Sequence, residues 1–274
     1  MTPSTREGRI SVSSEGGVAA VVIDDPAHRN ALTRTMCLQL QELMPQLDAD
    51  PSVSVVTLRG AGETFSAGAS IRDLPSVLMD AQADGTRIDQ LSRADAAIAA
   101  VAKPTIALVD GACMGGGWQL ASACDFIIAS ERSVFAITPA KLGVIYPRAG
   151  IERLVRLIGP ATAKLILFAA EPFGATRAAQ LGLVAEVVAD SAFDQRVTSL
   201  VDVIQSRSQF STHTLKRLVD GAGDRGPHVD LEWDAAWAAM AEGPDMAVGV
   251  AAFLARESPH FMWQPTGQGA VRIV

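Results

Sequence analysis

The sequence is poor in cysteine and shows no pattern of disulfide or metal-binding cysteines. Its 274 residues include only three cysteines, Cys37, Cys113 and Cys124. The count is odd and no two of them form a CxxC pair, so a disulfide framework is not expected. All three lie in apolar surroundings, which favours buried, unreactive thiols. None has histidine neighbours at the spacing of metal ligands, so no metal site is predicted.

Long apolar runs and an excess of positive charge are also lacking. No segment approaches the roughly 18 apolar residues of a membrane span, and the N-terminus MTPSTREGRI has no apolar core of a secretion signal. The net charge of -7 and the pI of about 5.1 argue against nucleic acid or an anionic membrane as the main partner. We therefore expect a soluble, cytoplasmic protein with neither partner, and the 49% of apolar residues suffices for a large core.

Strand and helix patterns alternate through the first two thirds of the chain. Strands are expected at 18–23, 53–58, 105–109 and 126–129. Helices are expected from Thr33, where Pro45 should kink or end the helix, and again from Ile88 to Val101. This alternation predicts an α/β fold with crossover connections.

The chain is mostly helical from Gly150 onward, with one short strand expected at 183–188. Three helical stretches follow in the C-terminal part. The penultimate one carries Leu231, Trp233 and Trp237. These side chains are consistent either with a helix packed on the core or with a subunit interface.

Two loops of small residues are the best candidates for chemistry. FSAGASI (65–71) and GACMGGGWQL (111–120) each follow a strand, and the second runs into a helix. Small residues let a ligand approach the main chain closely, and the free N–H groups of a helix N-terminus suit negative charge. Two such loops side by side could aim two amides at one carbonyl oxygen. The alternative is a pair of tight turns that only pack a strand against a helix. Neither loop fits GxGxxG or a P-loop.

Four segments together resemble the crotonase (enoyl-CoA hydratase/isomerase) superfamily. FSAGASIRDL (65–74) resembles its FxAGADIxEL segment, and GACMGGGWQLASACD (111–125) resembles NGxxxGGGxELAxxCD. DDPAHRNAL (24–32) and AFLARESPHF (252–261) resemble the family's N-terminal xRPxxxNAL and C-terminal AFLEKRxPxF elements. The segments occur in family order at family-like separations, so the resemblance covers nearly the whole chain.

The resemblance implies an α/β, crotonase-like spiral of ββα units with a C-terminal helical trimerisation region. We expect a spiral acyl-CoA-binding core at 1–204 and a helical oligomerisation region at 205–274, in a homotrimer or dimer of trimers. The implied ligand is an acyl-CoA thioester. Coenzyme A is then part of the substrate, and no separate cofactor is expected.

The same resemblance implies a set of site residues. The thioester oxygen would lie between the amides of Ala69 and Gly116. The implied substrate-binding residues are Arg29, Ala31, Ser66, Ala67, Ser70, Ile71, Arg72, Gly115, Trp118, Thr138, Leu142, Phe253 and Arg256. Of these, Phe253 and Arg256 would reach the ligand from a neighbouring subunit. The alternative for the three arginines is solvated surface charge, and for Trp118 it is packing beneath the helix.

Two carboxylates that the family uses for hydration are missing. One glutamate positions water and the other moves a proton, and both roles need a titratable group. Gln119 and Pro139 stand at these two positions, and Ser70 replaces the family's aspartate after AGA. An amide can orient water but takes no proton at neutral pH, and proline offers no acid or base. The sequence therefore disfavours hydration by two glutamates.

The segment TPAKLGVIY (138–146) resembles the TPxxLGVxY stretch of methylmalonyl-CoA decarboxylase in the same superfamily. Decarboxylation needs no base, since loss of CO₂ generates the enolate directly. Tyr146 stands where that enzyme has an active-site tyrosine, although a buried structural aromatic explains it equally well. Ala69 replaces a histidine of that enzyme and speaks against the likeness. Three functions stay open: a hydratase/isomerase-type enzyme, a decarboxylase relative and a non-catalytic acyl-CoA-binding protein. The loop from Leu74 to Ile88 should shape the pocket, but it has no pattern that reveals acyl-chain length.

Overall fold

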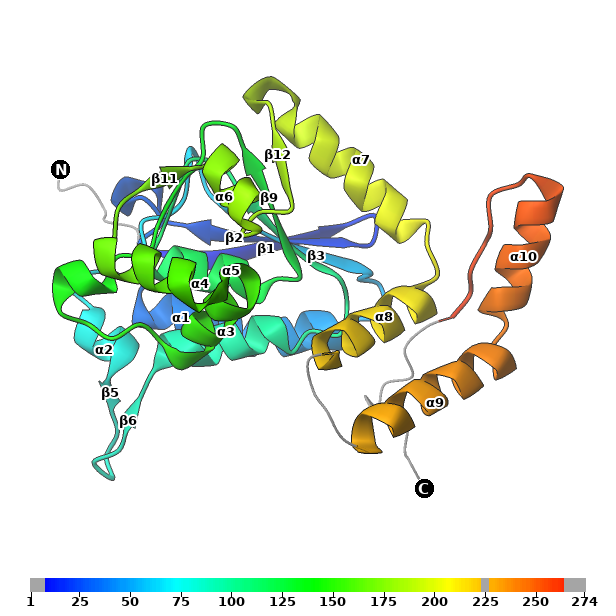
Figure 1. Ribbon diagram of the computed structural model, residues 1–274, viewed down its shortest axis with the longest axis horizontal. Coiled ribbons are helices and arrows are strands. Elements are labelled where there is room, and N and C mark those ends of the chain that lie inside the picture. The colour runs from blue at the N-terminus through cyan, green and yellow to red at the C-terminus, as the bar shows by residue number, and fades with distance from the viewer. Residues whose placement is uncertain (1–7, 223–226, 264–274) are drawn as a thin grey trace, which may run out of the picture.

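Two sheets of mainly parallel strands form the body of the molecule, and helices surround them (Figure 1). The computed structural model describes residues 8–222 and 227–263. The outermost residues of the predicted regions 1–204 and 205–274 lie outside these ranges, and the boundary between the two regions stays a prediction.

The larger sheet has six strands in the order β1-β2-β3-β7-β9-β12. Its first two strands form an antiparallel hairpin, and from β2 onward each neighbour is parallel. The strands are β1 (Arg9–Glu15), β2 (Val18–Asp24), β3 (Val55–Gly60), β7 (Thr105–Val109), β9 (Phe126–Ser130) and β12 (Glu186–Val188). The four early strands expected from the sequence are all present, whereas β1 is an addition to them.

The smaller sheet has the order β11-β10-β8-β4. Strands β4, β8 and β10 are parallel, and β11 is antiparallel to β10. The bounds are β4 (Thr64–Ser66), β8 (Ala112–Met114), β10 (Val134–Ala136) and β11 (Phe173–Gly174), and a separate hairpin pairs β5 (Asp80–Ala81) with β6 (Arg87–Ile88).

The two sheets are built from a repeated unit. In β3–β4, β7–β8 and β9–β10, the first strand joins the larger sheet and the second joins the smaller one. A helical segment follows each pair. The helices are α1 (Arg34–Ala49), α2 (Leu74–Leu78), α3 (Gln90–Ala99), α4 (Gly116–Ala123), α5 (Arg148–Ala169), α6 (Ala175–Leu181), α7 (Phe193–Gln205), α8 (Gln209–Gly221), α9 (Pro227–Glu242) and α10 (Asp245–Ala255). The predicted spiral of ββα units is thereby confirmed.

Strand β7 shows why the sheet is buried on both faces. Ala107 and Val109 join the main core, whereas Ile106 and Leu108 face the second apolar cluster, which includes Phe193 of α7. A strand covered on both sides is expected to be apolar throughout, as this one is. The three cysteines lie buried in the main core, where burial raises the pKa of the Cys37 and Cys124 thiols to about 12. The expectation of buried thiols is confirmed.

One of the two outcomes expected at Pro45, an early end of the helix, was wrong, because α1 runs to Ala49 with Pro45 inside it. The other outcome, a kink, stays a prediction. The buried side chains of Met44 and Leu47 on either side of the proline keep the segment packed on the core, which offsets the lost hydrogen bond. The segment from Leu74 to Ile88 is not an open loop, since it contains α2 and the projecting hairpin β5–β6 (Figure 1).

Helices α9 and α10 stand apart from the two sheets (Figure 1). Trp233 and Trp237 of α9 are 42% and 61% exposed, so they do not pack into this chain's own core. No single helix in the described ranges is long and apolar enough to cross a membrane. The helices Leu231–Glu242 and Asp245–Ala255 are long and apolar enough only when they are taken together, and the chain bends by 57° between them.

Candidate active site

Three parallel strands of the smaller sheet end at one edge. In the register of this sheet Thr64 pairs with Ala112, and Met114 pairs with Ala136. The segments that follow these strands are 67–70, 115–116 and 138–139. Because parallel strands run in one direction, their carboxyl ends bring all three segments together. The two small-residue loops therefore lie side by side, as the sequence led us to expect.

Ala69 and Gly116 place their main-chain nitrogens close together. A methyl group on Gly116 would lie 3.2 Å from the Ala69 nitrogen. Ala69 forms a parallel β-bridge with Leu32. In this bridge the Leu32 N–H donates to the Gly68 carbonyl oxygen and the Ser70 N–H donates to the Leu32 carbonyl oxygen, so the Ala69 N–H takes no part. Gly116 is the first residue of α4, where an N–H has no acceptor within the helix. Neither N–H donates to an acceptor in the described part of the chain, so both are free to bind one oxygen atom.

Two glycines shape the loops that present these amides. Gly68 has a φ of +92°, and a side chain there would approach the Met114 carbonyl oxygen within 2.8 Å. Gly115 has a φ of +46° and precedes the first turn of α4. Both conformations are costly for residues with a Cβ atom. The position of the two N–H groups therefore follows from the backbone, independently of nearby side-chain chemistry.

A buried asparagine ties the first loop to the segment before α1. The Asn30 side chain donates to the Ala61 and Thr64 carbonyl oxygens and accepts from the Asp25 N–H. The Ser66 hydroxyl donates to the Asn30 carbonyl oxygen at 2.8 Å and accepts from the Gly68 N–H at 3.1 Å. Ser66 is fully buried. It therefore supports the loop and lies outside the cavity wall, and its contact with a substrate stays a prediction.

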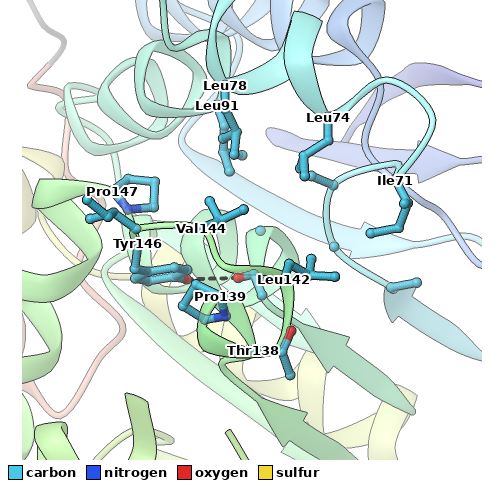
Figure 2. Close-up of a pocket in the computed structure, with 16 residues that line it drawn as sticks. Ile71, Leu74, Leu78, Leu91, Thr138, Pro139, Leu142, Val144, Tyr146 and Pro147 are labelled. Carbon is cyan, nitrogen blue, oxygen red and sulfur yellow. Dashed lines mark hydrogen bonds between the residues drawn. The ribbon is translucent and has the colours of Figure 1, made fainter. Parts of the chain in front are cut away.

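A cavity of about 90 Å³ lies against the paired amides, and Figure 2 shows its lining. Its wall is apolar apart from main-chain groups and two hydroxyls. The lining residues are Ala67, Gly68, Ala69, Ile71, Leu74, Leu78, Leu91, Gly115, Gly116, Thr138, Pro139, Leu142, Val144, Ile145, Tyr146 and Pro147. None of these residues is acidic, basic or histidine. The cavity thus pairs two hydrogen-bond donors with a wall that offers no side-chain acid or base at neutral pH.

Tyr146 links the cavity wall to the second loop. Its hydroxyl donates to the Gly115 carbonyl oxygen at 2.8 Å, the contact drawn in Figure 2. The side chain is buried, and burial raises the pKa of the phenol well above its ordinary value. The hydroxyl is therefore neutral and already engaged in a hydrogen bond. Thr138, across the wall, carries the other hydroxyl.

Gln119 is fully buried and does not line the cavity. Its Nε2 donates to Asp95 Oδ1 at 3.2 Å, and Asp95 forms an ion pair with Arg153 at 2.8 Å. Its Oε1 has no hydrogen-bond partner in the described chain and lies close to Gly150. The side chain thus belongs to a buried polar network, and the catalytic role expected for Gln119 stays a prediction. Pro139 does line the cavity.

Trp118 is also absent from the cavity wall. Its side chain is fully buried, and its ring centroid lies 6.4 Å from that of Tyr146. Packing beneath the helix, the alternative for this residue, is the arrangement found.

The remaining predicted contacts fall into two groups. Ala67, Ile71, Gly115, Thr138 and Leu142 line the cavity. Arg29, Ala31, Ser70, Arg72, Phe253 and Arg256 lie outside its wall. Of the latter, the three arginines and Phe253 are exposed. Their contacts with coenzyme A stay predictions.

Several residues that line or support the cavity were not predicted as site residues from the sequence. Leu74, Leu78 and Leu91 belong to the wall, and Asp95 lies behind it with Arg153. Leu91 and Asp95 are four residues apart on α3, so helical periodicity placed them on one face. No pattern in the sequence shows that this face meets the glycine loop.

The fold defines the class of protein: the chain has the crotonase fold. The family model "Enoyl-CoA hydratase/isomerase" matches residues 13–264, and the chain belongs to this enzyme family. A solved structure of an enoyl-CoA hydratase/isomerase family member is 61% identical, with a TM-score of 0.93 over 95% of this chain and 99% of that one.

Two curated relatives come from a bacterium and a plant. A crotonyl-CoA hydratase of Syntrophomonas wolfei is 31% identical over 260 residues, which are 92% of this chain and 97% of the relative. A peroxisomal Delta(3,5)-Delta(2,4)-dienoyl-CoA isomerase of Arabidopsis thaliana is 29% identical over 264 residues, which are 92% of this chain and 95% of the relative. The relatives thus include both hydratases and isomerases.

Proposed function

We propose that the protein binds an acyl-CoA thioester with its carbonyl oxygen between the N–H groups of Ala69 and Gly116 and stabilises the enolate of that thioester. The observation that carries this proposal is the pair of adjacent N–H groups with no acceptor in the described chain, beside an apolar cavity that opens to solvent. Negative charge grows on the thioester oxygen as the enolate forms. Two preorganised donors in a site of low polarity stabilise that charge more than the neutral ground state.

The cavity wall argues against hydration by two carboxylates. No acidic side chain lines it, Pro139 occupies one expected position, and Gln119 is fully buried outside the wall. Asp95, a buried carboxylate near Gln119, is engaged by Arg153 and Gln119. A general acid or base must come within hydrogen-bond reach of the substrate. None of the residues that line the cavity carries such a group at neutral pH.

Decarboxylation of a 2-carboxyacyl-CoA is the second candidate, and the acid-free wall favours it. In this reaction the bond between the α-carbon and the carboxylate breaks and CO₂ leaves. The electron pair of that bond forms the enolate, and a water molecule then supplies the proton to the α-carbon. The hydroxide that remains combines with the CO₂ to give bicarbonate, so atoms and charge balance. An apolar wall disfavours the charged carboxylate and favours its loss. Thr138 and Tyr146, at the positions of the resembled TPxxLGVxY segment, both line the cavity.

The remaining parts of the proposal concern the rest of the ligand and the assembly. Arg29, Ala31 and Arg72 would hold coenzyme A, with Phe253 and Arg256 contributed by a neighbouring subunit of a homotrimer or dimer of trimers in the cytoplasm. The apolar surface of α10 supports an assembly, since Phe253 is 82% and Leu254 is 76% exposed. Arg256 ends α10 in a left-handed conformation and is exposed. No cofactor other than the coenzyme A of the substrate is proposed.

The test is to incubate the purified protein with crotonyl-CoA, a 3-enoyl-CoA and methylmalonyl-CoA and to follow the products by mass spectrometry. We expect decarboxylation of methylmalonyl-CoA, with little hydration of crotonyl-CoA and little isomerisation of the 3-enoyl-CoA, because the cavity wall carries no acid or base for either proton transfer. A Gly116→Ala variant, whose methyl group would occupy the space beside the Ala69 nitrogen, should lose this turnover. Gly249→Ala is the matched control, because a methyl group there makes only ordinary contacts.

Three results would count against parts of the proposal. Rapid hydration of crotonyl-CoA that survives Gln119→Ala would show that a route to hydration exists without the two carboxylates. Binding of all three thioesters without turnover would identify a non-catalytic acyl-CoA-binding protein. Absence of binding would overturn the proposal as a whole.

A further inference from the structure

The cavity beside the paired amides is small for an acyl site. Its volume is about 90 Å³. An apolar protein cavity of about 150 Å³ holds benzene, with six carbons, so a cavity of this size holds about four. We propose that the protein selects short acyl groups of about four carbons, apolar beyond the α-carbon, and that Leu78 and Leu91 set this limit. This inference rests on the proposed binding of an acyl-CoA thioester.

Leu91 forms the part of the cavity wall next to the paired amides. Its Cδ2 atom would lie 3.2 Å from a methyl group on Gly116, and its side chain is only 2% exposed. Figure 2 shows Leu78 and Leu91 on one side of the cavity, with Pro139 and Leu142 on the other. An acyl chain that starts at the two N–H groups therefore meets the leucines of α2 and α3 within a few bonds.

A buried carboxylate holds these two helices in place. Asp80, which follows α2, accepts hydrogen bonds from Arg34 Nε at 2.7 Å and from Gln90 Nε2 at 2.6 Å. Gln90 immediately precedes Leu91 and is itself bonded to Gln41 of α1 at 3.1 Å. The wall is thus anchored to α1 on one side and to the hairpin on the other. A wall fixed in this way does not move apart at low cost, so it limits the size of the acyl group.

The chemistry of the wall sets the second part of the selection. No charged side chain lines the cavity, and the Tyr146 hydroxyl is already bonded to the Gly115 carbonyl oxygen. A carboxylate or ammonium group at the far end of the acyl chain would lose its hydration and gain at most the neutral Thr138 hydroxyl as a side-chain partner, which leaves the charge uncompensated and is costly. A short alkyl or alkenyl chain gains from the same burial.

The experiment measures binding without relying on turnover. Isothermal titration compares coenzyme A with acetyl-, butyryl-, hexanoyl- and octanoyl-CoA on the full chain. We expect affinity to rise from acetyl- to butyryl-CoA by about fourfold for each buried CH₂ group and to rise no further with hexanoyl- and octanoyl-CoA. In Leu91→Ala the increase should continue to hexanoyl-CoA.

Two further variants make the test specific. Leu78→Ala shortens a wall residue that is only partly buried, so this variant can be used if Leu91→Ala does not fold. In Leu78→Ala, too, the affinity should continue to rise from butyryl- to hexanoyl-CoA. Leu165→Ala is the matched control, since Leu165 is 64% exposed on α5 and lies outside the wall; its length profile should equal that of the unchanged protein. A rise that continues to octanoyl-CoA in the unchanged protein, or a profile that neither leucine variant alters, overturns the size limit and leaves the proposed function standing. Failure of coenzyme A and all its thioesters to bind overturns both.

Discussion

The Tyr146 hydroxyl donates a hydrogen bond to the carbonyl oxygen of Gly115, the residue that precedes the free N–H of Gly116. This contact joins the segment after β10 to the start of α4. Because the Gly115 carbonyl and the Gly116 N–H belong to one planar peptide group, the hydrogen bond from Tyr146 also fixes the orientation of the Gly116 N–H. Gly150 packs closely against both the Tyr146 ring and Gln119 Oε1. Tyr146 therefore both lines the cavity and supports the loop that presents the Gly116 amide.

Tyr146 should not ionise in the folded protein until the pH is well above about 10, the ordinary pKa of a tyrosine. Burial raises the pKa of its phenol. Because the folded pKa is the higher one, its contribution to stability is complete below about pH 10 and is lost as the pH rises towards the folded value. Tyr146 is the only tyrosine in the chain, so the absorbance of phenolate reports this residue alone. An equal midpoint in native and urea-unfolded protein would show that the side chain is not buried.

Gln119→Glu should not create a hydratase. The new carboxylate would lie beside Asp95, fully buried and outside the cavity wall. Two buried carboxylates in contact do not both ionise readily, so the pKa of the new glutamate is raised in the folded state. Its effect on the free energy of unfolding is therefore small at low pH and grows more unfavourable as the pH rises above about 4, the ordinary pKa of a glutamate.

Urea unfolding of Gln119→Glu and of the uncharged control Gln119→Met, each followed from about pH 5 to about pH 8, checks the pH dependence. The midpoint of the glutamate variant should fall with rising pH, and that of the methionine variant should stay level. A gain of crotonyl-CoA hydration in the glutamate variant would contradict the position assigned to Gln119.

Gly150→Ala should destabilise the fold by about 1–3 kcal/mol, the usual cost of overpacking a core. A methyl group at Gly150 would lie 2.3 Å from Gln119 Oε1 and 2.6 Å from the Tyr146 ring. Gly249 is also helical but has its nearest neighbour at 3.5 Å. Gly249→Ala should therefore be neutral or stabilising by up to about 1 kcal/mol. Equal urea midpoints for the two variants would contradict the close packing around Gln119.

The paired amides could be predicted from the sequence because their position depends on the backbone. Small residues directly after a strand predict a close approach to the main chain, and Gly115 and Gly68 adopt the conformations that only glycine takes readily. The order of strands in the smaller sheet then follows from the ββα repeat. These are local features, which a sequence pattern records well.

The side-chain surroundings of the site could not be predicted in the same way. Gln119 donates to Asp95, which is also paired with Arg153 in a buried polar network. Asp95 lies 24 residues from Gln119 in the sequence, and nothing local indicates the contact. The early end expected at Pro45 was wrong for a related reason, since tertiary packing of Met44 and Leu47 outweighs the local preference of proline.

The infrared frequency of a labelled thioester tests the paired amides most directly. Butyryl-CoA carrying ¹³C at its carbonyl gives a stretching band that falls when the oxygen accepts hydrogen bonds. Bound to the protein at saturation, this band should shift to lower frequency than in free butyryl-CoA, and the shift should be lost in Gly116→Ala. A bound carbonyl with the frequency of the free thioester would contradict the placement of its oxygen between Ala69 and Gly116.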